Sequence, residues 1–464
     1  MNLGEIPRNM REQKIAQKYM FGIMCLGDFM KISNNNANSD CLGISLKQSK
    51  TVAKAIFHID VNSAFLAWEA IELLKEGATQ DLRLIPAIVG GDPATRRGIV
   101  LSKSHPCKPY KIITGESLYT ALKKCPELTI VPGRYHLYEK YSQNLLEYLG
   151  QYSDRVQQYS VDEAFVDYTH MEEHFGPPMV AADKIRNGLK EKYGYTVCVG
   201  VGPNKLLAKM ATELRKPDFT NSLFPDEIEK MWALPIEELF MAGRATAPKL
   251  RRIGIQTIGD LAHYDVKYLV PHFKSHAHLL WRYANGIDDS EVVVSHGPAK
   301  SIGNSTTTPY DVIRHEDANR ILLHLCESIG KRLRKSNVSA GVISVGIRNK
   351  SFEYYSHQKK ISIPTDVTTE LYRHTVQIFK EGWRREPIRQ LGVRAEKLYG
   401  SQFAQISLFD TGETEKLKKI DRSVDAIRER FGDQSIMRAS FLCEGTKDGH
   451  SLDKFSPFRS TGGL

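Results

Sequence analysis

Apolar residues recur with two different periods in the first half of the chain, and together these periods predict an α+β domain. The run at 55–59 is short, branched and aromatic, and it ends at Asp60, as is typical of a buried strand. Between residues 155 and 168 apolar and polar positions alternate, which indicates a hairpin that turns near Asp162 and Glu163. The other predicted elements are strands at 85–91, 98–102 and 196–200 and helices at 65–76, 137–149, 180–193 and 204–214.

The pattern changes near Pro217, and the second half of the chain divides into smaller parts. Residues 226–290 contain short helical segments broken by Gly and Pro, and residues 291–300 have the composition of an extended linker. We expect a separate small α+β domain over 301–399. Its predicted strands lie at 342–347, 352–355, 361–363 and 392–398, around two helices.

Both ends of the chain have a different character. Residues 1–50 contain a polar stretch, SNNNANSD at 33–40, and little that can be buried, so we expect a flexible N-terminal extension. We expect residues 400–464 to form a C-terminal tail. An apolar helical stripe within this tail predicts a helix that docks either on this protein or on a partner, and the pattern does not decide between them. The stripe consists of Leu417, Ile420, Val424, Ile427 and Phe431.

Charge and cysteine content narrow the class of protein. The 464 residues carry a formal net charge of +10. Residues 298–400 contribute 18 Lys+Arg against 10 Asp+Glu, a surplus of eight, so a polyanionic partner is expected there. Seven scattered cysteines without a CxxC pair indicate a reducing compartment and no zinc site.

No apolar run approaches the roughly 20 residues that a membrane span requires, so we expect a cytoplasmic protein without a membrane partner.

Three carboxylates are candidates for metal binding. Asp60 ends a predicted strand, and Asp162 and Glu163 are adjacent at a predicted turn. Clustered carboxylates repel one another unless a cation neutralises them. A pair of divalent ions would do so and would hold the attacking and leaving oxygens of a phosphoryl transfer. The alternative for each of them is an ordinary residue that caps a turn.

The residues around these carboxylates resemble a known family. Asp60 lies in FHIDVNSAF at 57–65, and Asp162 and Glu163 lie in YSVDEAF at 159–165. A third motif, GVGPNKLLAK at 200–209, leads to RKP at 215–217. In this order and spacing the motifs resemble those of Y-family translesion DNA polymerases, and the likeness continues to residue 399. The wording QYSVDE at 158–163 looks closest to the UmuC-type branch, the catalytic subunit of bacterial polymerase V.

The resemblance implies a right-hand polymerase of the α+β class with palm, short fingers, a helical thumb and a separate little-finger domain. It implies two Mg²⁺ ions held by Asp60, Asp162 and Glu163 with the Val61 carbonyl, and it places Glu163 near the primer 3′-hydroxyl. The implied boundaries are palm 51–63 and 132–226, fingers 64–131, thumb 227–290 with a degenerate helix-hairpin-helix, linker 291–300 and little finger 301–399.

The same resemblance assigns a site for the deoxynucleoside triphosphate. Phe65 matches the bulky steric gate that leaves no room for a ribose 2′-hydroxyl; its alternative is a core aromatic residue. Triphosphate binding needs cations and hydroxyl or backbone donors. The implied contacts are Ser102, His105, which stands where many relatives have Tyr, Lys108 and Lys216. Each of these is otherwise an ordinary surface residue. GVGP at 200–203 is interpreted as a packing motif.

Two regions are expected to hold primer-template DNA through its phosphates. In the thumb, Met241 replaces the first glycine of the helix-hairpin-helix, while Gly243 remains and Lys249 follows. In the little finger, the expected contacts are Lys300, Arg348, Lys350 and Arg394. The basic helix residues Arg332, Arg334 and Lys335 are expected to be solvated.

A pentapeptide follows the little finger. Residues 405–409 read QISLF and resemble the bacterial sliding-clamp-binding peptide, with apolar anchors and a glutamine as contacts. The expected clamp contacts are Gln405, Ile406, Leu408 and Phe409.

These patterns predict a template-directed DNA polymerase for lesion bypass in DNA repair and the SOS response, error-prone and without proofreading. Two alternatives belong to other classes: a non-catalytic DNA- and clamp-binding scaffold, and a palm-fold nucleotide cyclase. A cyclase needs neither a basic DNA-gripping domain nor a clamp peptide. The need for accessory subunits is left open by the sequence.

Overall fold

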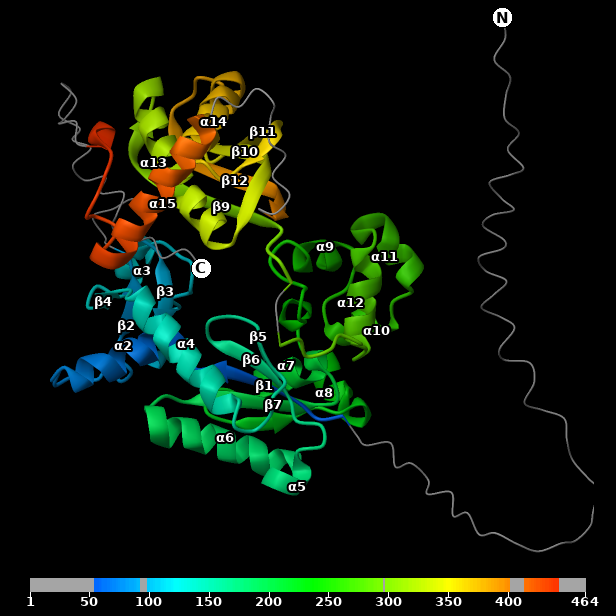
Figure 1. Ribbon diagram of the computed structural model, residues 1–464. Helices are drawn as coiled ribbons and strands as arrows, with labels where there is room; N and C mark the ends of the chain where they lie inside the picture. The colour runs from blue at the N-terminus through cyan, green and yellow to red at the C-terminus, as the bar shows by residue number, and fades with distance from the viewer. Residues whose placement is uncertain (1–53, 92–97, 295–296, 401–412, 442–464) are drawn as a thin grey trace, which may run out of the picture. The chain divides into compact units, whose positions relative to one another are not determined.

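The computed structural model describes residues 54–91, 98–294, 297–400 and 413–441. These residues form three sheets with helices packed on them, so the predicted α+β class is confirmed (Figure 1). The predicted extension 1–50 and the pentapeptide 405–409 lie outside the described residues.

A five-stranded sheet in the order β5-β6-β1-β7-β8 carries the candidate carboxylates. Its central strand β1 (Ile56–Val61) is antiparallel to β6 (Glu163–Asp167) and β7 (Val197–Gly202). The other elements around it are β5 (Val156–Gln158), β8 (Thr220–Ser222), α2 (Ala64–Lys75), α4 (Tyr135–Leu149), α5 (Glu172–Phe175), α6 (Pro178–Tyr193) and α7 (Lys205–Leu214).

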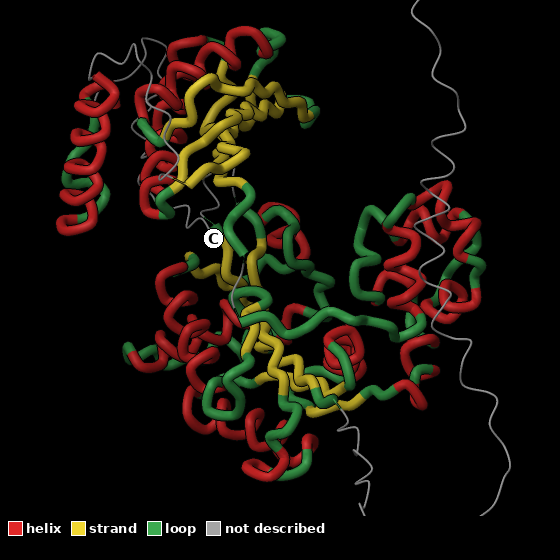
Figure 2. The backbone as a smooth tube through the Cα atoms, turned by 45° about the vertical axis from the view of Figure 1, so that its right-hand side comes forward, coloured by secondary structure: helices red, strands yellow, loops and turns green. Residues whose placement is uncertain are grey.

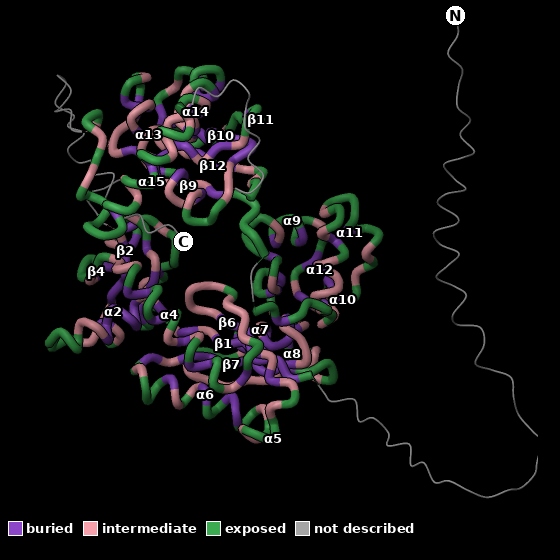
Figure 3. Tube along the Cα trace, viewed as in Figure 1, coloured by how far each residue is buried: buried purple, intermediate pink, exposed green. Residues whose placement is uncertain are grey.

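Alternation along β1 separates a core face from a chemical face. Phe57, Ile59 and Val61 pack in one core with α2, α4 and α6. His58 and Asp60 point the other way, toward the side on which α7 packs. In Figure 3 the strands β1 and β7 are coloured as buried, in contrast to the exposed turns of α5.

Glycines allow α7 to lie directly on β7. A Cβ atom at Gly200 would stand 2.0 Å from the Ala208 carbonyl oxygen, and one at Gly202 would stand 2.7 Å from the Ala208 nitrogen. The helix begins after Asn204, whose side chain accepts a hydrogen bond from the Leu207 amide at 2.8 Å. The interpretation of GVGP as a packing motif is therefore supported, because only glycine fits this close approach.

A smaller sheet and a group of helices follow the predictions in outline. The predicted strand pair forms, with β2 (Ala87–Gly90) antiparallel to β3 (Val100–Lys103) and parallel to β4 (Thr129–Pro132). The short helix α3 (Leu118–Lys124) shares the core of this sheet. The helical group shares its core with α7 and consists of η2 (Pro225–Glu227), α8 (Glu229–Trp232), η3 (Ile236–Glu238), α9 (Ala247–Arg252), α10 (Ile258–His263), α11 (Val266–Phe273) and α12 (His276–Ala284).

The late domain is a four-stranded antiparallel sheet in the order β11-β10-β12-β9. Both α13 (His315–Lys335) and α14 (Thr368–Gly382) pack on this sheet, and the helices lie on one side of the strand layer (Figure 2). Its strands are β9 (Ser301–Val312), β10 (Val338–Asn349), β11 (Tyr354–Thr365) and β12 (Ile388–Gly400).

Two strand predictions in this domain were wrong. The separate runs at 352–355 and 361–363 belong to one strand, β11, and the polar residues between them are exposed. Strand β9 was not predicted at all. Its sequence, SIGNSTTTPYDV, is mostly polar, and its pairing with β12 places it in the sheet.

Helix α15 (Glu413–Phe431) packs on α13 and the start of α14 through charged residues. Asp421 and Arg428 are the buried members, whereas Ile420, Ile427 and Phe431 of the predicted stripe are exposed. Arg334, expected to be solvated, instead has a side chain only 9% exposed and binds Asp421 and Asp425 at 3.1 and 2.6 Å. The helix therefore docks on this protein, and its fully buried contacts are charged, while Leu417 and Val424 of the apolar stripe are half-buried.

Candidate active site

Strand register brings the three candidate carboxylates to one end of the central sheet. Asp60 on β1 is the direct antiparallel partner of Glu163, the first residue of β6. The Val61 amide donates to the Asp162 carbonyl oxygen at 3.1 Å, which fixes the turn before β6 against β1. The predicted hairpin is confirmed, with Glu163 on the strand and Asp162 in the turn.

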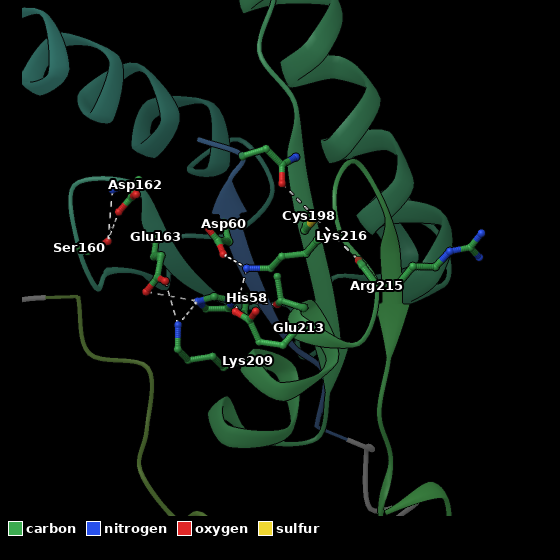
Figure 4. A network of polar contacts seen from close by, with 12 residues as sticks. His58, Asp60, Ser160, Asp162, Glu163, Cys198, Lys209, Glu213, Arg215 and Lys216 are labelled. Carbon is green, nitrogen blue, oxygen red and sulfur yellow. Dashed lines mark hydrogen bonds and ion pairs between the residues drawn. The ribbon is translucent and has the colours of Figure 1, made fainter. Parts of the chain in front are cut away.

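Each carboxylate has its own polar partner (Figure 4). Asp60 Oδ2 lies 2.5 Å from Lys216 Nζ, which also contacts Glu213 at 2.8 Å. Glu163 Oε1 accepts from Lys209 Nζ at 2.9 Å. Asp162 Oδ1 accepts from the Ser160 hydroxyl at 2.6 Å. Two carboxylates thus contact lysines, and the third contacts only a neutral donor.

The pKa values follow these partners. Burial raises the pKa of Asp162, and the charges of Asp60 and Glu163 raise it further against the opposing Ser160 hydrogen bond. Burial would also raise the pKa of Glu163, but the contacts with His58 and Lys209 lower it to about 2. The pKa values of the adjacent carboxyl groups of Asp162 and Glu163 are therefore shifted in opposite directions.

Behind Glu163 lies a fully buried histidine. His58 Nδ1 is 2.8 Å from the Thr212 hydroxyl, and its Nε2 is 3.8 Å from Glu163 Oε2. Burial lowers the pKa of His58. A neutral ring that faces both α7 and Glu163 supports the carboxylate without adding a charge.

The donor set suits a divalent cation of the hard, oxygen-binding type. In the part of the chain that the structure describes, no three His, Cys, Asp or Glu side chains converge as metal ligands. Asp60 and Glu163 each contact a lysine. The same negative charges that raise the pKa of Asp162 would be neutralised by a cation. The three residues thus fit such an ion in chemistry and in placement on the sheet.

A cavity of about 350 Å³ opens beside Asp60. It brings together five predicted residues from distant segments: Asp60, Val61, His105, Lys108 and Lys216. His105 and Lys108 reach it from the single turn η1 (His105–Cys107) that follows β3. The tertiary fold therefore brings the loop at 105–108 beside Asp60, whereas Asp162 and Glu163 do not line this cavity.

Two predicted nucleotide contacts do not line this cavity. Ser102 is 8% exposed, and its neighbour on the strand, Lys103, is among the lining residues instead. Phe65 is half-buried on α2, next to the lining residues Leu66 and Ala67. Alternation along β3 is the signal for Lys103, since successive residues of a strand face opposite sides.

Sequence reasoning also missed Arg83, another lining residue. Its guanidinium binds Asp81 and donates to the Gly194 carbonyl oxygen at 2.8 Å. Lys103 Nζ donates to the Ile112 carbonyl oxygen. The cavity is therefore lined by four basic side chains, which are Arg83, Lys103, Lys108 and Lys216.

The late domain has a polar concavity of about 840 Å³ on its sheet. Of the four residues expected to contact DNA, Arg348 of β10 and Arg394 of β12 line this concavity, whereas Lys300 and Lys350 lie outside its lining at strand ends. Arg348 Nε is buried without a hydrogen-bond partner among the described residues. Arg332 also lines the concavity and donates to the Gly303 carbonyl oxygen at 2.9 Å, so its predicted solvation was wrong, while Lys335 is exposed.

The segment predicted as a degenerate helix-hairpin-helix contains a left-handed residue at the position of the replaced glycine. Met241 adopts a left-handed conformation with φ 73° and is 49% exposed. Gly243 follows, and its carbonyl oxygen accepts from the Thr246 and Ala247 amides at 2.8 and 3.0 Å. Lys249 is exposed on α9. The turn is formed without glycine at position 241, at a cost in backbone strain.

No helix among the described residues is long and apolar enough to cross a membrane. The four cysteines in this part of the chain, Cys107, Cys125, Cys198 and Cys326, are buried free thiols.

Comparison with known proteins identifies relatives for most of the chain. Two family profiles match, the impB/mucB/samB family over residues 59–213 and the impB/mucB/samB family C-terminal domain over residues 299–408. DNA polymerase IV of Clostridium acetobutylicum is 44% identical over 393 residues, which cover 84% of this chain and 99% of that protein. DNA polymerase IV of Acetivibrio thermocellus is 35% identical, with 84% of this chain and 98% of that protein covered.

A solved structure is similar in fold. The Y-family DNA polymerase chimera Dbh-Dpo4(243-245)-Dbh superimposes with a TM-score of 0.64 at 22% identity, covering 75% of this chain and 99% of the other. This likeness confirms the expected architecture of palm, fingers, thumb and little finger.

Proposed function

Since this chain belongs to the impB/mucB/samB family of Y-family DNA polymerases, we propose that it extends primers on damaged templates by two-metal-ion nucleotidyl transfer without proofreading. It is a template-directed DNA polymerase. The observation that carries the proposed mechanism is the pairing of Asp60 with Glu163 beside a cation-lined cavity. The palm, fingers, thumb and little-finger boundaries proposed from the sequence divide the chain accordingly.

In this mechanism Asp60, Asp162, Glu163 and the Val61 carbonyl would hold two Mg²⁺ ions. Bound metal supplies charge stabilisation for the transferred phosphoryl group and for the primer oxygen. Lys216 leaves Asp60 and turns to the triphosphate, joining Lys108 and His105. Ser102, which was expected to contact the triphosphate, is buried on β3 outside the cavity lining, so no triphosphate contact is proposed for it. Phe65, on the helix that borders the cavity, excludes a ribose 2′-hydroxyl.

Duplex DNA is held by phosphate contacts in this proposal. Arg348 and Arg394 in the sheet concavity are the main contacts, with Lys300 and Lys350 at its rim and Gly243 and Lys249 on the thumb. The surplus of eight positive charges over 298–400 supports this assignment.

Within the family, DNA polymerase IV is the nearer functional guide. The relatives compared above bear that name, and the expected UmuC-type branch receives no specific support from them. The polymerase V requirement for accessory subunits is therefore not part of the proposal. We place the enzyme in the bacterial cytoplasm and in the response to DNA damage.

The pentapeptide at 405–409 is proposed to bind the sliding clamp. Its placement just after the little finger supports this role, with Ile406, Leu408 and Phe409 as apolar anchors and Gln405 as the hydrogen-bonding residue. Replacing both Leu408 and Phe409 by Ala should abolish clamp-stimulated synthesis and leave basal synthesis unchanged.

Primer extension by the purified chain tests the proposed function. Wild type should extend a primer opposite an undamaged base and opposite a lesion when Mg²⁺ is present. Asp162→Asn should extend neither, yet bind primer-template DNA within about twofold of wild type. Binding of DNA and clamp by a wild type that extends no primer would support the scaffold alternative and overturn the enzyme.

A further inference from the structure

The ring of Phe65 rests flat against a second aromatic ring. Its centroid lies 4.3 Å from that of Tyr138 on α4, and the two planes are inclined by only 9°. Phe65 is half-buried, whereas Tyr138 is 1% exposed. The gate ring is therefore backed by a ring that belongs to the core.

Tyr138 is held by a buried carboxylate on the same helix as Phe65. Glu69 lies one helical turn after Phe65 and is 2% exposed. Its Oε1 accepts from the Tyr138 hydroxyl at 2.7 Å, and its Oε2 accepts from Arg134 Nε at 2.7 Å. The Arg134 amide donates to both Glu69 and the Tyr138 oxygen at 3.1 Å.

This arrangement is well suited to fixing a ring in place. A carboxylate is buried only when several donors satisfy it, and such charge-assisted bonds are strong and directional. Burial and the adjacent carboxylate of Glu69 raise the pKa of Tyr138, so its hydroxyl remains a donor. The Tyr138 ring is fixed at its outer end by the hydroxyl and along its face by Phe65.

We propose that Glu69 is a positioning residue for sugar selection, because it holds the Tyr138 ring behind Phe65. Glu69 reaches no nucleotide itself. A gate excludes a 2′-hydroxyl only if its ring cannot retreat, and a displacement of about 1 Å is enough to change a reaction rate greatly. The inference rests on the proposed gate role of Phe65 and adds the residues that make the gate rigid.

The chain offers a matched control one turn further along both helices. Tyr141 donates from its hydroxyl to Glu72 Oε1 at 2.7 Å and is 3% exposed. Its ring stacks on Trp68, with centroids 5.7 Å apart, and not on Phe65. The two pairs share chemistry and helices, but Tyr138 stacks on the gate ring directly, whereas Tyr141 stacks on Trp68, whose ring centroid lies 6.0 Å from that of Phe65.

The test is single-nucleotide insertion with matched deoxy- and ribonucleoside triphosphates by the full chain. Tyr138→Phe and Glu69→Gln should each lower the ratio of kcat/KM for deoxy over ribo substrate by about tenfold, which corresponds to about 1.4 kcal/mol of discrimination. Tyr141→Phe and Glu72→Gln should leave that ratio within about twofold of wild type. The double variant Phe65→Ala/Tyr138→Phe should be no more permissive than Phe65→Ala, since both act through one ring.

The outcomes separate the inference from its premise. An unchanged ratio in Phe65→Ala removes the gate itself. A permissive Phe65→Ala with an unchanged ratio in Tyr138→Phe overturns the role of the Glu69–Tyr138 pair. Equal losses for both sugars, or an equally permissive Tyr141→Phe, would show general loosening and also overturn it. Should Glu69→Gln fail to fold, Tyr138→Phe, which removes one hydroxyl, decides alone.

Discussion

Asp162 and Glu163 are adjacent in the chain yet differ in what their charge does to stability. Contacts with His58 and Lys209 stabilise the ionised form of Glu163. Asp162 is instead buried beside a neutral donor and two negative neighbours, which disfavour its ionised form. An ionised carboxylate stabilises a fold when its pKa is lowered and destabilises it when its pKa is raised. The proposed metal-binding role therefore requires an ionised Asp162, although the ionised form lowers the stability of the fold.

Neutral substitutions at these two positions should shift stability in opposite directions. With EDTA present at neutral pH, Asp162→Asn should raise the thermal midpoint, because an unfavourable charge is removed. Glu163→Gln should lower it, with a loss of roughly 1–2 kcal/mol after solvent screening is considered. Differential scanning fluorimetry of both variants gives the answer, and shifts of the same sign would contradict the electrostatic account.

The Glu163 contribution should also depend on pH. Its pKa falls from the ordinary 4.5 to about 2, so its stabilising effect is present above pH 4.5 and is lost as the pH falls from there toward about 2. The difference in thermal midpoint between wild type and Glu163→Gln should shrink over that window. A difference that stays constant down to the acid limit would indicate a packing effect.

At the level of elements, α15 shows how a polar helix docks. Asp421 binds Arg334 and also accepts from the Thr368 amide at 2.8 Å, at the first turn of α14. Because Val367 offers no capping side chain, Asp421 supplies the cap from another helix. Glu327 holds the second half of the contact through Arg428 and Arg438 at 3.2 and 2.7 Å.

Removing one buried partner should release this helix. Asp421→Ala leaves Arg334 with fewer partners and should cost about 3 kcal/mol of docking free energy. Hydrogen exchange of the α15 amides, followed by mass spectrometry, should then become faster. Asp433→Ala is the control, since its pair with Lys331 is exposed and worth less than about 1 kcal/mol. Equal protection of α15 in both variants would show that the buried pair does not hold the helix.

At the scale of the whole molecule, the distribution of positive charge is more informative about DNA binding than the total net charge. Eight of the ten net positive charges lie within 298–400, the part that contains the sheet concavity. When binding to DNA depends on phosphate contacts, the logarithm of the binding constant falls linearly with the logarithm of salt concentration.

Two of the arginines that line the concavity, Arg348 and Arg394, should each account for about one unit of that salt dependence. Arg348→Ala and Arg394→Ala should each reduce the slope of log Kd against log salt by about one and weaken binding to all sequences alike. Lys335→Ala removes an exposed charge at the end of α13 and should leave the slope unchanged. Fluorescence anisotropy over a salt series measures all three, and a slope unaffected by the arginine variants would place the DNA elsewhere.

Local sequence patterns were enough to predict many of the strands and helices of this protein. The period of apolar residues predicted β1, the 155–168 hairpin and α7, because strand and helix periodicities are properties of neighbouring residues. The order of the sequence motifs then predicted that Asp60, Asp162, Glu163 and Lys216 belong to one site. The strand register agrees with this prediction, since Asp60 is paired with Glu163.

Only the tertiary structure decided which charged side chains form ion pairs with one another. Lys209 and Glu163 are 46 positions apart, Lys216 and Asp60 are 156 apart, and Arg334 and Asp421 are 87 apart. No periodicity relates such positions, and a basic helix residue looks solvated until another element covers it. Strand β9 was missed for the same reason, because its pairing partner β12 and not its own polar sequence makes it a strand. Packing of distant segments therefore decided the partners of each charge and the place of β9 in its sheet, while the sequence by itself determined the strongly periodic elements and the chemical groups they carry.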